Sequence, residues 1–369
     1  MSKILFHHNC LEQGGAERVI SNLANSFSKN GDEIIVATEW QGENEFVLNS
    51  EVRRIHVGLS EADERKNRIS KILIRVKNLR NLIKLEKPDI VLGFTRKPLF
   101  RALMASMGLK VPVVVAVRSD PFYEYDNFAD RMSVRFLFPR ADGAVFQTKM
   151  QKSFFPKYIQ KKSVIILNPV NAKYFTDCSE SNKEKLVVST GRLVELKNQA
   201  MLLKAFIRIH NEYPDYTLKL FGEDSGDGTK EKLEKIIADN NADEYIKLMG
   251  GSDSLEIELA KAEVFAFASD SEGMPNSILE AMCMGLPVVA TDCPCGGPAT
   301  IIQNNINGIL TPVGDEEAFA GAIISMLSNK DKAREMGEKA KEIRKMTSGD
   351  SITRAWRDYI DKVIGEKNV

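Results

Sequence analysis

The chain has 369 residues, which is enough for two domains with a full core each. Its composition, 43% hydrophobic and 28% charged, is ordinary for a globular protein, and the absence of any run of about 18 apolar residues argues against a membrane span. The N-terminal sequence MSKILFHHNC is too short and polar for a secretory signal, so we expect a cytoplasmic protein.

Charge is distributed unevenly along the chain, although the formal net value is zero. Residues 1–165 carry 27 lysines and arginines against 18 acids, a net of +9, and the remaining residues carry a net of −9. A basic half next to an acidic half indicates that the first half faces an anionic partner.

Strand-like and helical segments alternate along the whole sequence, a pattern typical of parallel α/β sheets. The strand-like runs of a first sheet lie at residues 3–9, 32–40, 88–94, 111–119, 141–147 and 162–170. Those of a second sheet lie at residues 185–193, 216–223, 245–251, 263–270 and 287–292. The polar stretch 172–184 is the expected linker, so we predict one α/β domain over 1–170 and another over 171–350.

The segment from about Arg65 to Lys87 predicts a long amphipathic helix. Its apolar residues follow the i, i+3, i+4 spacing of one helix face: Ile69, Ile72, Leu73, Val76, Leu79 and Ile83. The other faces carry nine lysines or arginines against one acid, Glu86. An ordinary crossover helix with a solvated basic face explains this pattern, and so does contact with an anionic membrane surface or a polyanionic acceptor. Both interpretations stay open.

The first strand is followed by the turn CLEQGGAERVI. Gly14 and Gly15 let the backbone turn sharply, and the helix beyond them can direct its free N–H groups at a phosphate or a sugar. Glu39, at the end of the second strand, falls where a dinucleotide-binding fold keeps its ribose-binding acid. A nicotinamide-dependent oxidoreductase is therefore an alternative, although the turn lacks the G-x-G-x-x-G pattern.

The second half opens with VVSTGRLVELKNQAMLLKAF. Arg192 follows a strand, Lys197 lies five residues further on, and Asn198 can cap the next helix. Both cations would lie at the carboxyl edge of a parallel sheet, where such folds bind ligands. Arginine presents a rigid fork to phosphate oxygens and lysine a mobile point charge, so the pair suits a phosphate site. Two surface cations in a loop are the plainer interpretation.

The stretch SEGMPNSILEAMCMGLPVVA, residues 271–290, is the most informative part of the sequence. Glu272 and Glu280 lie eight positions apart across the start of a predicted helix that begins near Pro275 and stops at Gly285. The N-terminus of that helix offers free N–H groups and a partial positive charge to a phosphate or to sugar hydroxyls. One acid can hold a sugar and the other a ribose, so the segment predicts a nucleotide-sugar site.

This segment, together with the GGAER turn and the G-R-L…K motif, resembles the group 1 family of retaining glycosyltransferases. The matches run in the family's order from Gly14 to about Pro312. The resemblance implies the GT-B fold, in which two Rossmann-like α/β domains face each other across a cleft. It also implies that the first domain binds the acceptor, that the second binds the nucleotide sugar, and that the last helix, about residues 352–364, packs back on the first.

The resemblance also implies roles for individual residues. Arg192 and Lys197 would neutralise the leaving diphosphate, Glu272 would hold the donor sugar, and Glu280 would accept hydrogen bonds from the ribose hydroxyls. The other expected substrate contacts are Gly14, Gly15, Asp120, Gly222, Met249, Met274, Pro275, Asn276 and Ser277. Many members of the family have a histidine where this chain reads VRSDPFYEY, so the roles of Arg118 and Asp120 stay open.

We therefore expect a retaining glycosyltransferase that moves a hexose or N-acetylhexosamine from a UDP-sugar to a saccharide acceptor. We expect no cofactor and no metal, since no D-x-D motif fits the sequence, and no nucleic-acid partner. The basic helix 65–87 suggests a polyprenyl-diphosphate-linked acceptor and peripheral contact with the inner face of the cell membrane, as in cell-surface glycan assembly. The alternatives are a GT-B epimerase or phosphorylase, a non-catalytic sugar-nucleotide-binding protein, and the oxidoreductase.

Overall fold

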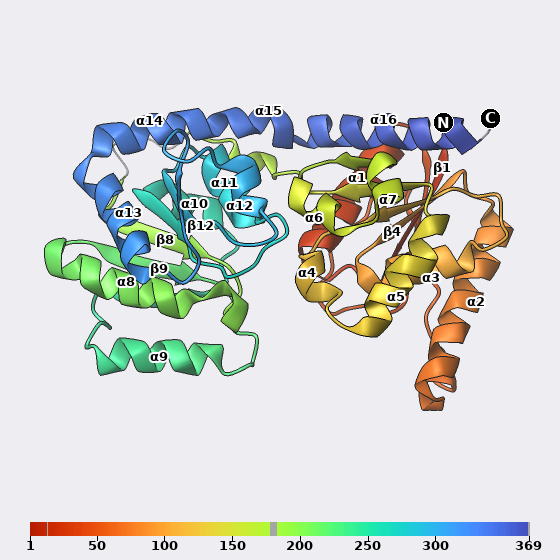
Figure 1. Ribbon diagram of the computed structural model, residues 1–369, viewed down its shortest axis with the longest axis horizontal. Helices are drawn as coiled ribbons and strands as arrows, with labels where there is room; N and C mark the ends of the chain where they lie inside the picture. Colours follow the sequence, from red (N-terminus) through yellow and green to blue (C-terminus); the bar gives the residue numbers. More distant parts are fainter. Residues whose placement is uncertain (13, 178–182, 368–369) are drawn as a thin grey trace. The chain divides into compact units, whose positions relative to one another are not determined.

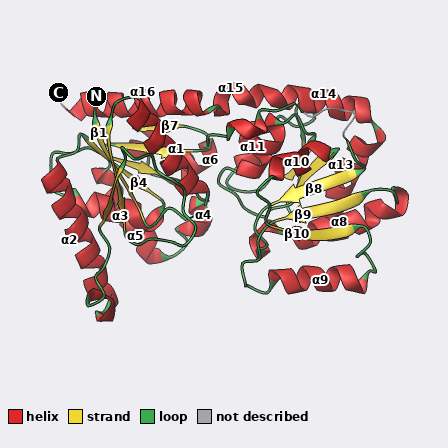
Figure 2. Ribbon diagram, turned by 180° about the vertical axis from the view of Figure 1, so that it is seen from behind, coloured by secondary structure: helices red, strands yellow, loops and turns green. Residues whose placement is uncertain are grey.

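The computed structural model of the chain describes residues 1–12, 14–177 and 183–367. Its contacts divide the chain into one unit made of Met1–Pro169 with Gly349–Val369 and a second unit made of Val170–Ser348. Part of the expected linker, residues 178–182, lies outside the described residues. Figures 1 and 2 show that each unit is built on one sheet with helices on both of its faces.

The first unit contains a seven-stranded parallel sheet in the order β3-β2-β1-β4-β5-β6-β7. Its strands are β1 (Lys3–His8), β2 (Glu33–Thr38), β3 (Arg53–His56), β4 (Ile90–Phe94), β5 (Val113–Ala116), β6 (Gly143–Phe146) and β7 (Ser163–Ile165). The central strands are buried on both faces, as apolar runs such as IVLGF in β4 predict for a sheet covered by helices.

The helices of the first unit connect these strands. They are α1 (Gly15–Lys29), α2 (Arg68–Glu86), α3 (Arg96–Ala105), α4 (Pro121–Glu124), α5 (Phe128–Leu137), α6 (Lys149–Phe154), α7 (Lys157–Lys161) and α16 (Gly349–Lys367), with short 3₁₀ turns η1 (Asp63–Arg65) and η2 (Phe138–Arg140). Asn67 caps α2 by accepting a hydrogen bond from the amide of Ser70, so the long basic helix begins after η1 and not at Arg65.

The second unit contains a six-stranded parallel sheet in the order β10-β9-β8-β11-β12-β13. Its strands are β8 (Leu186–Thr190), β9 (Thr217–Phe221), β10 (Ile246–Gly250), β11 (Val264–Phe267), β12 (Val288–Thr291) and β13 (Ile309–Thr311). Its helices are α8 (Gln199–Glu212), α9 (Thr229–Asp239), α10 (Leu255–Lys261), α11 (Asn276–Cys283), α12 (Gly297–Ile301), α13 (Glu316–Ser328), α14 (Lys330–Ala340) and α15 (Arg344–Thr347), with 3₁₀ turns η3 (Ala172–Tyr174), η5 (Glu195–Lys197) and η6 (Lys341–Ile343).

The prediction of two Rossmann-like α/β domains is confirmed by these two sheets. Two strands were not predicted. β3 reads RRIH and is largely exposed, so it has no apolar run, and β13 has three residues, which is too short to stand out.

The C-terminal helix α16 packs on the first unit. Its Trp356 is fully buried and stacks on Phe94 of β4 with ring centroids 5.6 Å apart. The hydroxyl of Tyr359 accepts a hydrogen bond from the amide of Ala144 at 2.8 Å. The guanidinium of Arg118 lies close to both rings of this stack, 5.4 Å from the centroid of Phe94 and 5.3 Å from that of Trp356.

Helix α2 is only partly packed. Leu79, Leu82 and Ile83 are buried, whereas Ile69 is 71% exposed and Leu73 is 62% exposed. In both ribbon views the N-terminal turns of α2 project past the other elements of the first unit (Figures 1 and 2). The predicted apolar stripe is therefore buried only along the C-terminal half of the helix.

Candidate functional site

The carboxyl edge of the second sheet brings several predicted site residues together. Because all its strands are parallel, the segments that follow β8, β9 and β11 leave the sheet at one edge. Arg192 follows β8, Gly222 follows β9, and Glu272 follows β11. This edge of the second unit is the candidate site.

Gly222 allows two of these segments to touch. Its amide donates a hydrogen bond to the carbonyl of Gly250 at 2.8 Å, and the amide of Gly191 donates to Phe221 at 2.9 Å. A Cβ on Gly222 would overlap the carbonyl oxygen of Gly191, next to Arg192. The glycine is therefore required for the close approach that positions Arg192.

Gly222→Ala should lower both stability and activity, because the overlap is with backbone that cannot rotate away. We expect a loss of about 1–3 kcal/mol in the free energy of unfolding, typical of overpacking, together with a lower kcat. Gly321→Ala in helix α13 is the matched control, since nothing lies within 4 Å of its added Cβ. Denaturant unfolding and transfer assays of both variants make the test, and a Gly222→Ala protein as stable and active as the control contradicts it.

Lys197 and Glu272 form an ion pair at this edge, between Nζ and Oε1. The pair is partly buried, with side-chain exposures of 23% and 17%. Lys197 also lies 5.3 Å above the ring of Phe267, the last residue of β11. Two of the three residues predicted to be catalytic are thus in direct contact.

The loop that carries Glu272 is held by hydrogen bonds that the sequence did not reveal. Asn198, in the left-handed region with φ of 46°, donates to the carboxylate of Asp270 at 2.8 Å. The amide of Asp270 donates in turn to the carbonyl of Leu196 at 2.9 Å. The hydroxyl of Ser269 donates to the same carbonyl at 3.0 Å. These bonds fix the segment of Lys197 against that of Glu272.

A second loop supports Glu272 from the other side. The amide of Glu272 donates to the carbonyl of Pro294 at 2.7 Å, and the amide of Cys295 donates to the carbonyl of Glu272 at 3.2 Å. Burial raises the pKa of the nearby Cys293 thiol to about 12, so this cysteine is a protonated packing residue. A Cβ on Gly297 would overlap the carbonyl of Gly273, which accounts for the glycine there.

Helix α11 begins immediately after this loop. Pro275 is its N-cap, one position before the first turn, and Asn276 and Ser277 are its first two residues. Met274 is buried at 5% exposure. The amides of the first turn have no carbonyl partner within an α-helix, so the N-terminus supplies donors and a partial positive charge beside Glu272. Gly285, with φ of 78°, follows the end of the helix as predicted.

Glu280 lies on α11 and is only 5% exposed. A buried carboxylate is rare in a protein unless it is paired or serves a ligand. Arg192, unlike the buried Glu280, is exposed to solvent. Its guanidinium makes no ion pair within the described part of the chain. Met249, in β10, is 43% exposed at the same edge.

The first unit holds the other predicted site residues. Gly14 is the N-cap of α1 and Gly15 its first residue, while Gln13 of the same turn lies outside the described residues. His8, which sequence reasoning did not single out, ends β1 and pairs through Nε2 with Glu17 of α1 at 2.7 Å. The position of His8, at the end of a strand and close to the glycine turn, could have marked it in the sequence as a candidate site residue.

Asp120 has a structural role in the first unit. Its carboxylate caps α4 by accepting a hydrogen bond from the amide of Phe122 at 2.9 Å, and the residue is 8% exposed. Arg118 is likewise engaged, since its Nη1 donates to Asn168 at 3.2 Å and burial lowers its pKa to about 9. A contact of Asp120 with substrate stays a prediction.

Glu39 is not available to a ribose. The carboxylate is 3% exposed and pairs with Arg101 of α3 and, at 3.0 Å, with Arg75 of α2. His7 lies 3.5 Å from the same carboxylate, and burial lowers the pKa of its imidazole. Because two arginines already neutralise Glu39, the structure does not favour the dinucleotide interpretation.

The two parallel sheets define a class of protein, the two-domain α/β proteins with Rossmann-like domains, and the carboxyl edge of the second sheet is the candidate ligand site. Two family models match the chain, "Glycosyltransferase Family 4" over residues 13–174 and "Glycosyl transferases group 1" over residues 172–343. The chain belongs to the group 1 glycosyltransferases, as its motifs predicted, and it is a hexosyltransferase.

Similar proteins extend this picture. A Campylobacter jejuni enzyme is 26% identical over 98% of this chain and 99% of its own length. Its name is GalNAc-alpha-(1->4)-GalNAc-alpha-(1->3)-diNAcBac-PP-undecaprenol alpha-1,4-N-acetyl-D-galactosaminyltransferase. A second C. jejuni N-acetylgalactosaminyltransferase, also named for a diphospho-undecaprenol acceptor, is 29% identical over 67% of this chain and 68% of its own.

Solved structures share the fold. Anabaena HepE in complex with UDP and glucose has a TM-score of 0.84 at 19% identity, covering 98% of this chain and all of its own. Sucrose-phosphate synthase from Thermosynechococcus elongatus has a TM-score of 0.85 at 16% identity, covering 99% of this chain and all of its own. These similarities support two Rossmann-like domains of the GT-B type.

Proposed function

We propose that the protein is a retaining, metal-independent glycosyltransferase that moves a hexose or N-acetylhexosamine from a UDP-sugar to a lipid-linked saccharide acceptor. The observation that carries this proposal is the Lys197–Glu272 ion pair at the N-terminus of α11. A carboxylate suited to sugar hydroxyls and a cation suited to a diphosphate are held there side by side.

Each group of the site has a part in the proposed reaction. The bond between the anomeric carbon and the diphosphate oxygen breaks, and a bond to the acceptor oxygen forms on the same face of the sugar. The acceptor's proton passes to the departing phosphate oxygen, so no protein nucleophile is needed. Arg192, Lys197 and the amides of α11 stabilise the charge on the diphosphate, in place of a metal ion. Glu272 holds the sugar hydroxyls.

UDP is the proposed nucleotide because similar proteins use or bind it. The Streptococcus pneumoniae GtfA subunit, 29% identical over 66% of this chain and 48% of its own length, is named a UDP-N-acetylglucosamine–peptide N-acetylglucosaminyltransferase. The experiment is transfer from UDP-sugars in the presence of EDTA, with the anomeric configuration of the product read by NMR. Full activity with retained configuration supports the proposal. An inverted product contradicts retention, loss of activity in EDTA contradicts metal independence, and acceptor-independent turnover indicates an epimerase.

Glu280→Gln should weaken UDP binding by about tenfold or more. The carboxylate is proposed to accept hydrogen bonds from the ribose, and a bond to a charged group contributes about 1.5–3 kcal/mol. Glutamine keeps the size of the side chain, so the melting temperature should change little. Titration calorimetry gives the affinity, and an unchanged dissociation constant assigns the ribose contact to another residue.

The acceptor is proposed to be linked to a polyprenyl diphosphate, as the names of the C. jejuni relatives state for those enzymes. Within the described residues, no helix has the length and hydropathy needed to cross a bilayer. We propose instead that α2 holds the enzyme at the inner face of the membrane. Its exposed Ile69 and Leu73 lie among cations, of which Arg68 and Lys77 make no ion pair within the described chain.

Ile69→Ser combined with Leu73→Ser should reduce binding to vesicles that contain anionic lipid at low salt. Loss of two apolar anchors of this size should lower the partition coefficient at least tenfold. Val47→Ser combined with Ile257→Ser is the control, since both side chains are exposed elsewhere, at 83% and 55%. Flotation assays compare the variants, and equal binding of both pairs contradicts a role for α2.

A further inference from the structure

A cavity of about 420 Å³ lies in the first unit, at the amino edge of its sheet, where the chain enters β4 and β5. Its walls come from the C-terminus of α2, the segments that lead into β4 and β5, and α16. The lining residues are Ile83, Lys84, Lys87, Pro88, Asp89, Leu109, Lys110, Val111, Pro112 and Ile364. Neither the family's motifs nor the proposed reaction uses this cavity.

The charged residues at the cavity are unequally paired. The side chains of Lys84, Lys87 and Lys110 are exposed and have no ion pair or hydrogen bond within the described chain. The one acid of the lining, Asp89, already accepts a hydrogen bond from the backbone amide of Lys3 at 2.7 Å. Three cations therefore face one engaged carboxylate, which favours an anionic ligand.

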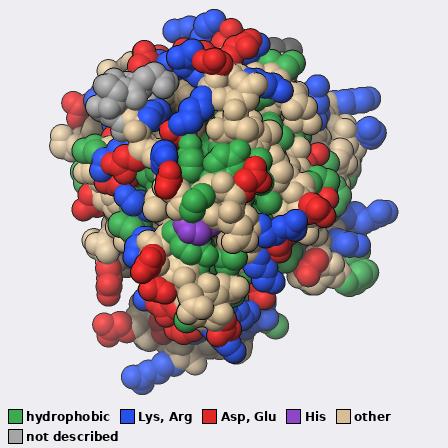
Figure 3. Space-filling model, turned by 90° about the vertical axis from the view of Figure 1, so that its left-hand side faces the viewer, with side chains coloured by type: hydrophobic (Ala, Val, Ile, Leu, Met, Phe, Trp, Pro, Cys, Tyr) green, Lys and Arg blue, Asp and Glu red, His purple; other side chains and the backbone are tan. Residues whose placement is uncertain are grey.

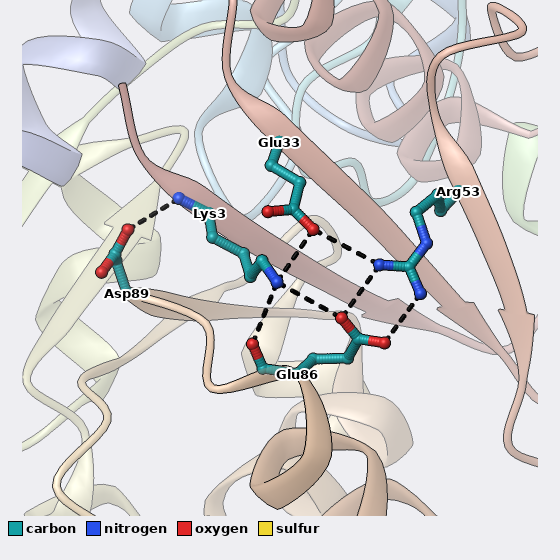
Figure 4. A network of polar contacts seen from close by, with 5 residues as sticks. All are labelled: Lys3, Glu33, Arg53, Glu86 and Asp89. Carbon is teal, nitrogen blue, oxygen red and sulfur yellow. Dashed lines mark hydrogen bonds and ion pairs between the residues drawn. The ribbon is translucent and has the colours of Figure 1, made fainter.

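The only acid of α2, Glu86, pairs with residues other than these lysines. Figure 4 shows Glu86 in a network with Lys3, Glu33 and Arg53, where its carboxylate accepts two hydrogen bonds from Arg53, at 2.7 and 2.9 Å. Lys3 also donates to it at 3.3 Å, and the pKa of Glu86 is lowered, with the bonds from Arg53 as the largest cause. Glu86 thus stays charged but does not neutralise Lys84 or Lys87.

Lys87 has a conformation that argues for a role of its side chain. It is the C-cap of α2 and lies in the left-handed region, with φ of 48° and ψ of 56°. Glycine or asparagine is usual at such a position, because a larger side chain is strained there. Lys87 therefore combines a strained backbone conformation with a position in the lining of the cavity.

The apolar part of the lining selects among anions. Ile83, Leu109, Val111 and Ile364 cover the wall, and the neighbouring Leu85 and Met107 are 78% and 40% exposed. A free phosphate or sugar phosphate would leave these surfaces wet. A phosphate group attached to a hydrocarbon chain satisfies both the lysines and the apolar wall.

We propose that this cavity binds the phosphate headgroup and the first part of an acyl chain of an anionic membrane phospholipid. The inference rests on the proposed membrane contact through α2, whose C-terminus forms one wall of the cavity. The helix would then contact the membrane at both ends, through Ile69 and Leu73 at its start and through the bound lipid at its end. The site would orient the enzyme on the bilayer surface.

The test uses the whole chain with labelled isoleucine methyl groups, and short-chain lipids below their critical micelle concentration. Dihexanoyl-phosphatidylglycerol should shift the methyl resonances of Ile83 and Ile364, and dihexanoyl-phosphatidylcholine and inorganic phosphate at the same concentration should not. Equal shifts with inorganic phosphate would reveal a free-phosphate site, and equal shifts with phosphatidylcholine an uncharged apolar pocket. Either result, or no shift with the anionic lipid, overturns the proposal.

Variants distinguish the lipid site in the cavity from the membrane contact proposed for the tip of α2, the turns that carry Ile69 and Leu73. Lys84→Gln, Lys87→Gly and Lys110→Gln together should abolish the shifts and lower partition into anionic vesicles, by about fivefold for each lysine removed. Folding stability should not fall, because glycine suits the left-handed C-cap. The matched control carries Lys204→Gln, Lys235→Gln and Lys345→Gln, three lysines exposed in the second unit. Retained shifts in the cavity variant contradict the proposal.

The outcome for the tip variant distinguishes the two membrane proposals. Ile69→Ser with Leu73→Ser should bind vesicles weakly yet keep the full lipid-induced shifts of Ile83 and Ile364. If that variant binds vesicles normally, the proposed contact through the tip fails while the cavity stands. If the wild-type chain shows no shifts but its vesicle binding depends on the tip, the cavity proposal fails alone.

Discussion

Arg192→Ala should lower kcat at least a hundredfold while leaving the fold unchanged. The guanidinium is exposed at the carboxyl edge of the second sheet and makes no ion pair within the described chain, so its removal leaves no buried partner behind. Loss of one preorganised group that stabilises developing charge costs about 2.7–4 kcal/mol in the transition state. Steady-state kinetics with a UDP-sugar and an acceptor measure the effect.

Arg208→Ala is the matched control for this variant. Arg208 is an exposed arginine near the C-terminal end of helix α8, and its guanidinium lies 3.6 Å from the carboxylate of Glu317. It should keep normal kcat. A near-normal kcat for Arg192→Ala, with Arg208→Ala also normal, removes Arg192 from its proposed role.

Lys197→Met should also lower kcat by about a hundredfold, because the lysine is proposed to stabilise the same diphosphate. Methionine keeps much of the apolar stem of the lysine but removes the ammonium group, which lies 5.3 Å from the ring centroid of Phe267. The ion pair with Glu272 makes a further prediction, since substitutions of residues in contact are not additive. The double variant Lys197→Met with Glu272→Gln should lose less activity than the two single losses combined.

The double-mutant cycle should give a coupling free energy of about 0.5–3 kcal/mol between the two residues. Lys204→Met, at an exposed position of α8, controls for the loss of a positive charge on the second unit. Strict additivity of the Lys197 and Glu272 substitutions contradicts the view that the pair works as one unit. Normal activity of Lys197→Met contradicts its catalytic role outright.

Much of the candidate site could be predicted because parallel sheets place their loops at one edge. Arg192 and Glu272 follow recognisable apolar strands, and helix α11 has clear start and stop residues in Pro275 and Gly285. The order of strands and helices can be read locally from the sequence. Once the strands are taken as parallel, the segments that follow them must lie together at the carboxyl edge of the sheet. The same reasoning predicted both domains.

Other features depend on contacts between residues far apart in sequence, which a single sequence does not display. Glu39 looked like a ribose acid until the structure showed Arg75 and Arg101 against it. Asp120 was predicted to contact substrate; the structure shows that it caps α4, and its contact with substrate stays a prediction. Helix caps and buried ion pairs use the same residue types as ligand sites, so spacing alone does not separate them.

Helix α2 illustrates a further limit. The spacing of Ile69, Leu73 and Ile83 predicted one apolar face, which is correct for the helix, but whether that face is covered depends on the length of its neighbours. Ile83 packs on the sheet, whereas the turns with Ile69 and Leu73 extend past it. The distribution of charge over the surface is also hard to infer from the sequence. Net charge per half of the chain does not show where the charges lie, and Figure 3 shows acidic and basic side chains interspersed over the face that it draws.

The measurement that tests the central claim most directly is titration calorimetry of the protein with UDP, GDP, ADP and NADH, with EDTA present throughout. The proposed site predicts micromolar binding of UDP without any metal, and weaker binding of the other nucleotides. Binding of NADH alone would contradict the proposed function. Gly14, Gly15 and Glu39 would then again be candidates for a dinucleotide-binding site. Failure of UDP to bind until a divalent metal is added would contradict the assignment of the diphosphate charge to Arg192, Lys197 and helix α11.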